Sequence, residues 1–156
     1  MDMCDALDWA EMDDQTKVVV ITGAGGNFCA GQDLKLYFRG TESDPKARVR
    51  ARRAAHTWRW DRLSSFPKAT IAMVHGYCFG GGFTPVIACD FAIAADDATF
   101  GLPEVDRGAL GAATHLARLV PQHRMRQMVY TAKPITASHF DVLVMCMPSE
   151  PDDEPG

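Results

Sequence analysis

Short runs of apolar residues that stop at a glycine constrain the fold of this chain more than any other feature. Residues 17–22 read KVVVIT and residues 70–75 read TIAMVH, and a glycine follows each run. Continuous β-branched runs of this length are typical of strands buried on both faces of a parallel sheet. A third strand is expected over residues 91–95, and a short extended piece over residues 98–101.

Helical spacing occupies the stretches between these runs. Residues 4–12 resemble the end of an amphipathic helix with Leu7 facing inward and Trp9 as a second inward candidate. A long helix is expected over residues 46–63, and a further one opens at the glycine triplet 80–82 and runs through Cys89. Helical spacing returns over 114–120 and 124–130. Strands that alternate with helices predict an α/β fold.

The length and composition fit one soluble domain. The chain has 156 residues, of which 47% are hydrophobic and 23% charged. We expect the domain to cover residues 1–147. Residues 148–156 are rich in proline and acidic side chains, so a disordered acidic tail is expected there.

Charge and cysteine usage exclude several classes of function. The net charge of −4 gives no general attraction to nucleic acid. The one basic stretch, residues 46–53, is interpreted as the solvated face of a helix. No apolar run approaches the length of a membrane span, and the acidic start is unlike a signal peptide. An odd number of scattered cysteines favours a reducing cytoplasm, and no cysteine or histidine spacing indicates a metal site.

Three features carry the candidate chemistry: the loop 30–34 (AGQDL), the triplet 80–82 (GGG), and Glu104 within FGLPE. Glycine lets a backbone approach a ligand closely, and a helix start leaves free N–H groups. Two such N–H groups can bracket a thioester oxygen, and a nearby carboxylate can move protons. Taken singly, the triplet is equally a tight turn and Glu104 equally an exposed residue of a helix start. The run GAGGNF is not a nucleotide loop, because phenylalanine occupies its last glycine position.

In their order along the chain these motifs resemble the crotonase (enoyl-CoA hydratase/isomerase) superfamily. The matching strings are residues 18–34 (VVVITGAGGNFCAGQDL), 69–82 (ATIAMVHGYCFGGG) and 90–104 (DFAIAADDATFGLPE). The resemblance implies an incomplete spiral of ββα units and an acyl-CoA substrate. It also implies a homo-oligomer, trimeric or hexameric, that uses no metal or other cofactor, because coenzyme A is part of the substrate.

The same resemblance implies roles for individual residues. The backbone amides of Gln32 and Gly81 correspond to the oxyanion donors, and Glu104 to the catalytic glutamate. The substrate-binding positions it implies are Ala30, Asp33, Leu34, Tyr37, Gly80 and Thr84.

Within the superfamily the chain is most similar to the 4-hydroxycinnamoyl-CoA hydratase-lyases. Thr84 stands where ordinary hydratases carry a second glutamate, and Tyr37 matches a residue that reaches the phenol end of the lyase substrate. The shared Trp58 and Trp60 are two residues apart on a helix, so at least one is expected in the core. The implied reaction hydrates a hydroxycinnamoyl-CoA and cleaves it to an aromatic aldehyde and acetyl-CoA.

Other interpretations stay open at this stage. Family members extend beyond this chain at both ends, and after Glu104 the run 106–111 (DRGALG) replaces the lyases' Trp-containing loop. A generic enoyl-CoA hydratase or isomerase, or an inactive fragment that only associates with partners, therefore remains possible. A hydrolase elbow around Cys78, with Asp106 and His123 as partners, is the alternative from a different enzyme class.

Overall fold

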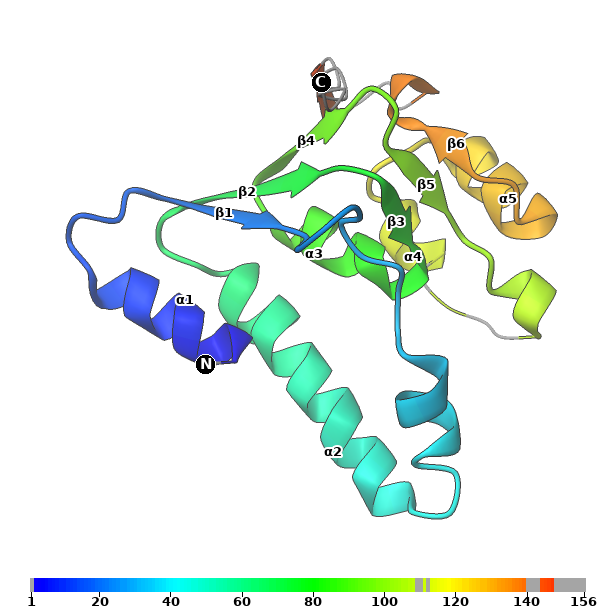
Figure 1. Cartoon of the computed structure of the whole chain (residues 1–156), viewed down its shortest axis with the longest axis horizontal. Helices are drawn as coiled ribbons and strands as arrows, with labels where there is room; N and C mark the ends of the chain where they lie inside the picture. The colour runs from blue at the N-terminus through cyan, green and yellow to red at the C-terminus, as the bar shows by residue number, and fades with distance from the viewer. Residues whose placement is uncertain (1, 109–110, 112, 140–143, 148–156) are drawn as a thin grey trace, which may run out of the picture.

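The computed structural model describes residues 2–108, 111, 113–139 and 144–147 (Figure 1). Its α-helices are α1 Met3–Met12, α2 Pro45–His56, α3 Phe83–Ala88, α4 Ala113–Leu116 and α5 Gln122–Thr131. The π-helices are η1 Leu34–Arg39 and η2 Thr57–Leu63, and the 3₁₀ turns are η3 Gly80–Gly82, η4 Val105–Arg107 and η5 Ala137–His139. The strands are β1 Val18–Thr22, β2 Ala69–Val74, β3 Tyr77–Phe79, β4 Phe91–Ala95, β5 Thr99–Gly101, β6 Ile135–Thr136 and β7 Val144–Met147.

The main sheet is parallel, with its described strands in the order β1-β2-β4-β7. Val20 of β1 pairs with Ile71 of β2, which pairs in turn with Phe91 of β4. Alternate residues of β2 and β4 are buried: Thr70, Ala72 and Val74 on β2, and Ala92 and Ala94 on β4. The predicted α/β class is confirmed, and all three predicted strands lie in this sheet.

The expectation that residues 17–22 are buried on both faces is wrong. Among the described strands β1 pairs only with β2, so it forms an edge of the sheet. Val18 is 46% and Val20 50% exposed, whereas Val19 and Ile21 are half-buried against the core. An edge strand with one covered face shows this alternation, which a run of apolar residues alone does not reveal.

A second, smaller sheet leads away from the end of β2. It has the order β3-β5-β6, in which β3 and β5 are parallel and β6 is antiparallel to β5 (Figure 1). The sequence analysis did not predict β3, β6 or β7, because runs of two to four residues carry no clear periodicity. Strand β3 leads directly into the glycine triplet, which forms η3.

The core cluster joins residues of both sheets with residues of α3, α4 and α5. The rings of Phe83 and Phe100 are tilted against each other with centroids 5.7 Å apart. Leu63, Leu116 and Met128 are buried in the same cluster. Trp58 and Trp60 are both half-buried and pack against this cluster, but neither is one of its buried residues, so the expected core tryptophan lies at the edge of the core.

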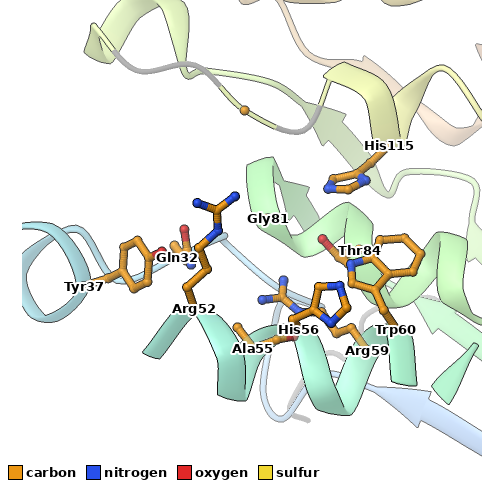
Figure 2. Close-up of a pocket in the computed structure, with 11 residues that line it drawn as sticks. Gln32, Tyr37, Arg52, Ala55, His56, Arg59, Trp60, Gly81, Thr84 and His115 are labelled. Carbon is orange, nitrogen blue, oxygen red and sulfur yellow. The ribbon is translucent and has the colours of Figure 1, made fainter. Parts of the chain in front are cut away.

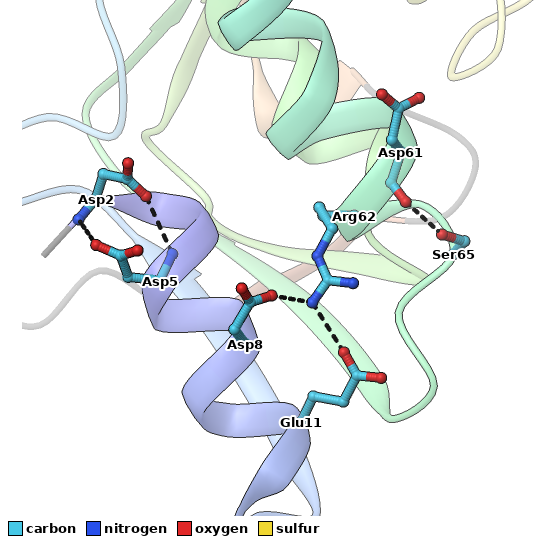
Figure 3. A network of polar contacts seen from close by, with 7 residues as sticks. All are labelled: Asp2, Asp5, Asp8, Glu11, Asp61, Arg62 and Ser65. Carbon is cyan, nitrogen blue, oxygen red and sulfur yellow. Dashed lines mark hydrogen bonds and ion pairs between the residues drawn. The ribbon is translucent and has the colours of Figure 1, made fainter.

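Helix α1 is held to η2 by charge as well as by its apolar face. Leu7 is buried as predicted, but Trp9 is 62% exposed, so its expected inward orientation is wrong. Arg62 of η2 forms ion pairs with Asp8 and, at 2.9 Å, with Glu11 (Figure 3). These carboxylates lie on the face of α1 that meets η2, which leaves Trp9 on the other side of the helix.

The long helix predicted over residues 46–63 is present as α2 followed directly by η2. Asp44 accepts hydrogen bonds from the amides of Lys46 and Ala47 and begins the helix at Pro45. No residue of α2 is buried, which confirms the interpretation of its basic stretch as a solvated face. Figure 1 shows that α2 extends away from the sheet beside η1.

Two further expectations concern the second half of the chain. Helix α4 ends at Leu116 rather than continuing to residue 120, and Pro121 disfavours helical backbone in the residue before it. The expected disordered tail, residues 148–156, lies outside the described residues. In the described ranges no helix is both long and apolar enough to cross a membrane.

Candidate active site

Backbone hydrogen bonds bring the first predicted loop against the connection that carries the glycine triplet. The amide of Phe28 donates to the carbonyl of His75, and the amide of Cys29 to the carbonyl of Tyr77, both at 2.9 Å. The amide of Phe79 donates back to the carbonyl of Cys29 at 2.9 Å. This short ladder fixes the loop that leads to Gln32 beside the chain that leads to Gly81.

The two predicted oxyanion donors lie at the facing edges of these loops. A Cβ built on Gly31 would lie 3.7 Å from the amide nitrogen of Gly81, and one built on Gly81 would lie 3.7 Å from the amide nitrogen of Gln32. Gly31 has φ +101°, and its Cβ position is only 3.0 Å from the carbonyl oxygen of Phe79. Only glycine tolerates both that backbone and that contact, so Gly31 allows the close approach of the two amides.

Glu104 lies directly behind the triplet, between β5 and η4. Its Oε1 would be 2.5 Å from a Cβ on Gly80, a residue with φ +52°. Its Oε2 is buried and has no hydrogen-bond partner within the described residues. Burial raises the pKa of the Glu104 carboxyl above its ordinary value. A half-buried carboxyl with a raised pKa is suited to taking up and releasing a proton.

A pocket of about 430 Å³ opens in front of the two amides. It is lined by Gln32, Tyr37, Arg52, Ala55, His56, Arg59, Trp60, Gly81, Thr84, Gly111 and His115. Figure 2 shows side chains from α2 and η2 on one side, His115 on the opposite side, and Tyr37 with Gln32 at one end. This volume is within the ordinary range for small-molecule sites.

The pocket unites some of the predicted site residues and leaves others outside its lining. Gln32, Gly81, Tyr37 and Thr84 line it, and Thr84 is 2% exposed. Glu104 and Gly80 do not line the pocket, although Gly81, the residue after Gly80, does.

The remaining predicted positions belong to the first loop. Ala30 and Leu34 are exposed and do not line the pocket. The carboxylate of Asp33 accepts hydrogen bonds from the amides of Lys35 and Leu36, so in this structure it caps η1.

Sequence reasoning missed the lining contributed by the long helix and by α4. Arg52, His56, Arg59 and Trp60 follow one another at spacings of four, three and one, so they share one side of the helix. That periodicity is present in the sequence and indicates a common face. Nothing local to it indicates that His115, from another segment, lies opposite.

The alternative nucleophile Cys78 is contradicted by its surroundings. Its side chain is 0% exposed, and desolvation raises the pKa of its thiol strongly. A buried protonated thiol is a structural residue rather than a nucleophile. Within the described segments no group of His, Cys, Asp and Glu side chains is arranged to hold a metal ion.

Comparison with known proteins agrees with this geometry. The sequence model of the enoyl-CoA hydratase/isomerase family matches residues 1–143. The chain therefore belongs to the enoyl-CoA hydratase/isomerase family, the crotonase superfamily. The computed structure also resembles the crystal structure of an enoyl-CoA hydratase from Polaromonas sp., with a TM-score of 0.82 and 29% identity, over 92% of this chain and 58% of that one.

Two curated relatives indicate different chemistries inside the family. The hydroxycinnamoyl-CoA hydratase-lyase of Pseudomonas fluorescens is 50% identical over 108 residues, which cover 69% of this chain and 39% of that protein. The (7aS)-7a-methyl-1,5-dioxo-2,3,5,6,7,7a-hexahydro-1H-indene-carboxyl-CoA hydrolase of Rhodococcus jostii is 42% identical over 98% of this chain and 59% of its own length. The chain thus spans between two fifths and three fifths of these relatives.

Proposed function

We propose that this chain acts on a CoA thioester by stabilising its enolate. The amides of Gln32 and Gly81 donate to the thioester oxygen, and Glu104 transfers the proton. The observation that supports this most is the position of the half-buried Glu104 carboxylate against Gly80, the residue before Gly81, with its buried Oε2 atom lacking a hydrogen-bond partner among the described residues. Removal of one such donor costs about 10²–10³ in rate in enzymes with an oxyanion hole, so two fixed donors are a large part of catalysis.

The specific reaction that we propose is the hydration and cleavage of a 4-hydroxycinnamoyl-CoA. Water adds across the Cα=Cβ bond: Glu104 takes one proton from the water as its hydroxyl adds to Cβ, and then passes that proton to Cα. Glu104 then helps to remove the hydroxyl proton, and the Cα–Cβ bond breaks with its electron pair entering the thioester enolate. The aldehyde leaves, and protonation of the enolate at Cα gives acetyl-CoA. This sequence needs no metal or redox cofactor, because coenzyme A is carried by the substrate.

Two features support a lyase over a generic hydratase. Thr84, at the position where hydratases carry a second glutamate, is buried and lines the pocket, so it supplies no second acid. Tyr37 lines the same pocket, where a phenol-bearing acyl group requires a polar partner. The 50% identity to a hydroxycinnamoyl-CoA hydratase-lyase supports the same choice.

A second candidate is the hydrolytic cleavage of a cyclic keto-acyl-CoA. It is favoured by the 42% identity to the dioxo-indene-carboxyl-CoA hydrolase over 98% of this chain. When water adds to a ketone placed β to a thioester, the breaking carbon–carbon bond also leaves a thioester enolate. The same two amides would serve this reaction, so the products must distinguish the two candidates.

Incubation of the purified chain with feruloyl-CoA and, separately, with crotonyl-CoA tests the proposal. We expect aldehyde release from feruloyl-CoA, reduced by about 10²–10⁴ in Glu104→Gln, the range for loss of a general acid–base group. Asp106→Asn, which changes an exposed acid two residues away, serves as the matched control. Hydration of crotonyl-CoA alone would indicate a generic hydratase. A folded protein that turns over neither ester would fit the inactive-fragment alternative.

The family also predicts a homo-oligomer. Light scattering on the purified chain tests this prediction. A trimer or hexamer is the expected result, and a monomer would contradict it.

A further inference from the structure

Among the described residues, the side chains around the pocket include two arginines and two histidines and no acidic group. Arg52, His56, Arg59 and His115 line it, and no aspartate or glutamate is among its lining residues. A site that only held an aliphatic acyl chain would favour an apolar lining. The composition of this lining therefore requires a different explanation.

Arg59 is the most informative of these side chains. It is half-buried, and in the described part of the chain no carboxylate lies within ion-pair distance of it. Its Nε donates to the carbonyl of Ala55 at 2.7 Å, and its guanidinium carbon lies 5.4 Å from the ring centroid of Trp58. Desolvation lowers the pKa of Arg59, which is the cost of a half-buried charge without a counter-ion. Such charges are normally paired, so a ligand is the natural source of the missing anion.

His115 faces this arginine from the opposite wall. Its ring lies 5.3 Å from the ring of Trp60, which also carries the guanidinium of Arg118 at 5.4 Å from its centroid. Burial, followed by the charges of Arg118 and Arg59, lowers the pKa of His115. This lowering favours the uncharged imidazole, which can donate one hydrogen bond.

Burial decides which part of a CoA ester reaches these two residues. Thr84 is buried and Arg59, Trp60 and His115 are half-buried, whereas Gln32, Arg52 and His56 are exposed. The first group defines the inner end of the pocket and the second group its mouth. The proposed oxyanion donors Gln32 and Gly81 line this pocket and would hold the thioester there, so the acyl group is the part of the ester that reaches its inner end.

We infer that Arg59, assisted by His115, recognises an anionic oxygen at the far end of the acyl group. The ligand class is an acyl-CoA that ends in a carboxylate, as opposed to a plain hydrocarbon chain. This inference rests on the proposed function only in requiring that a CoA ester bind with its acyl group in this pocket. The planar guanidinium can donate two parallel hydrogen bonds to a carboxylate, which makes it selective as well as attractive.

A binding series on one skeleton tests the inference. Dissociation constants for CoA, cinnamoyl-CoA, 4-hydroxycinnamoyl-CoA and 4-carboxycinnamoyl-CoA are measured by calorimetry in a Glu104→Gln background, which prevents turnover. The 4-carboxy ester is expected to bind at least tenfold more tightly than cinnamoyl-CoA. Arg59→Gln should remove this preference by raising the dissociation constant of the 4-carboxy ester about ten- to a hundredfold, the effect of a hydrogen-bonded charge pair. The dissociation constant of cinnamoyl-CoA should stay within about twofold of its value before the substitution. Arg53→Gln, an exposed arginine of the same helix outside the pocket, is the matched control.

Each other outcome overturns the inference. An equal loss of affinity for CoA itself in Arg59→Gln would mean that Arg59 holds the phosphates of the nucleotide. An equal loss for all three esters would mean that Arg59 only supports the shape of the pocket. Arg59→Lys keeps the charge and much of the volume. It should retain part of the preference for the 4-carboxy ester, which separates loss of the charge from a folding defect in Arg59→Gln. Binding is read without turnover, so failure of the proposed reaction would appear separately as the absence of product from the unaltered chain.

Discussion

Replacement of Gly80 by alanine would test the contact that fixes Glu104. Gly80 has φ +52°, a backbone conformation that costs a residue with a Cβ about 1–2 kcal/mol. The new Cβ would also lie 2.5 Å from Oε1 of Glu104, whereas ordinary contact begins at 3.4 Å. The carboxylate therefore has to move by nearly 1 Å.

The two costs are separable. The backbone strain lowers the free energy of unfolding, whereas the displaced carboxylate lowers turnover. A misplacement of about 1 Å in a catalytic group can cost about 100-fold in rate. Gly25→Ala is the control, because Gly25 also has a positive φ, +82°, but no atom within 4 Å of its Cβ position.

Urea unfolding and aldehyde release from feruloyl-CoA measure the two effects in parallel. Both alanine variants should lose about 1–2 kcal/mol of stability, and only Gly80→Ala should lose turnover. A folded Gly80→Ala protein with unaltered turnover would refute the placement of Glu104 as the proton-transfer group. Equal loss of turnover in Gly25→Ala would show that strain alone inactivates the protein.

Three further predictions concern Glu104, Cys78 and Arg62. Because burial raises the folded-state pKa of Glu104, the wild type loses stability as pH rises through that pKa, and Glu104→Gln does not. Urea unfolding between pH 4 and 8 should show the free energy of unfolding of the variant rising relative to that of the wild type as pH increases. A fall in the variant's relative stability with pH would contradict this prediction. Cys78 should resist alkylation in the folded protein and react only after denaturation, as mass spectrometry of its peptide would show; rapid labelling of the native chain would contradict its burial. Arg62→Ala removes the ion pairs to Asp8 and Glu11 and should lower the free energy of unfolding only slightly, by less in high salt than in low salt. A loss that does not depend on salt would assign the effect to packing.

Local sequence determined much of the architecture. The apolar runs at 17–22, 70–75 and 91–95 identified three of the four described strands of the main sheet, because short apolar runs bounded by turn residues are typical of strands. The helical spacing of 46–63 likewise identified one continuous helical segment. The motifs around Gln32, Gly81 and Glu104 identified the family, because backbone amides exposed by glycine loops are encoded by short, continuous strings.

Tertiary structure decided which faces are covered and which side chains meet. The exposure of Val18 and Val20 follows from the place of β1 at a sheet edge, and a strand's own residues do not specify its neighbours. The meeting of Arg59 with His115 likewise depends on how η2 and α4 pack across the pocket. Residues 56 positions apart in the chain share no local signal, so only the folded arrangement of the helices shows that Arg59 and His115 line the same pocket.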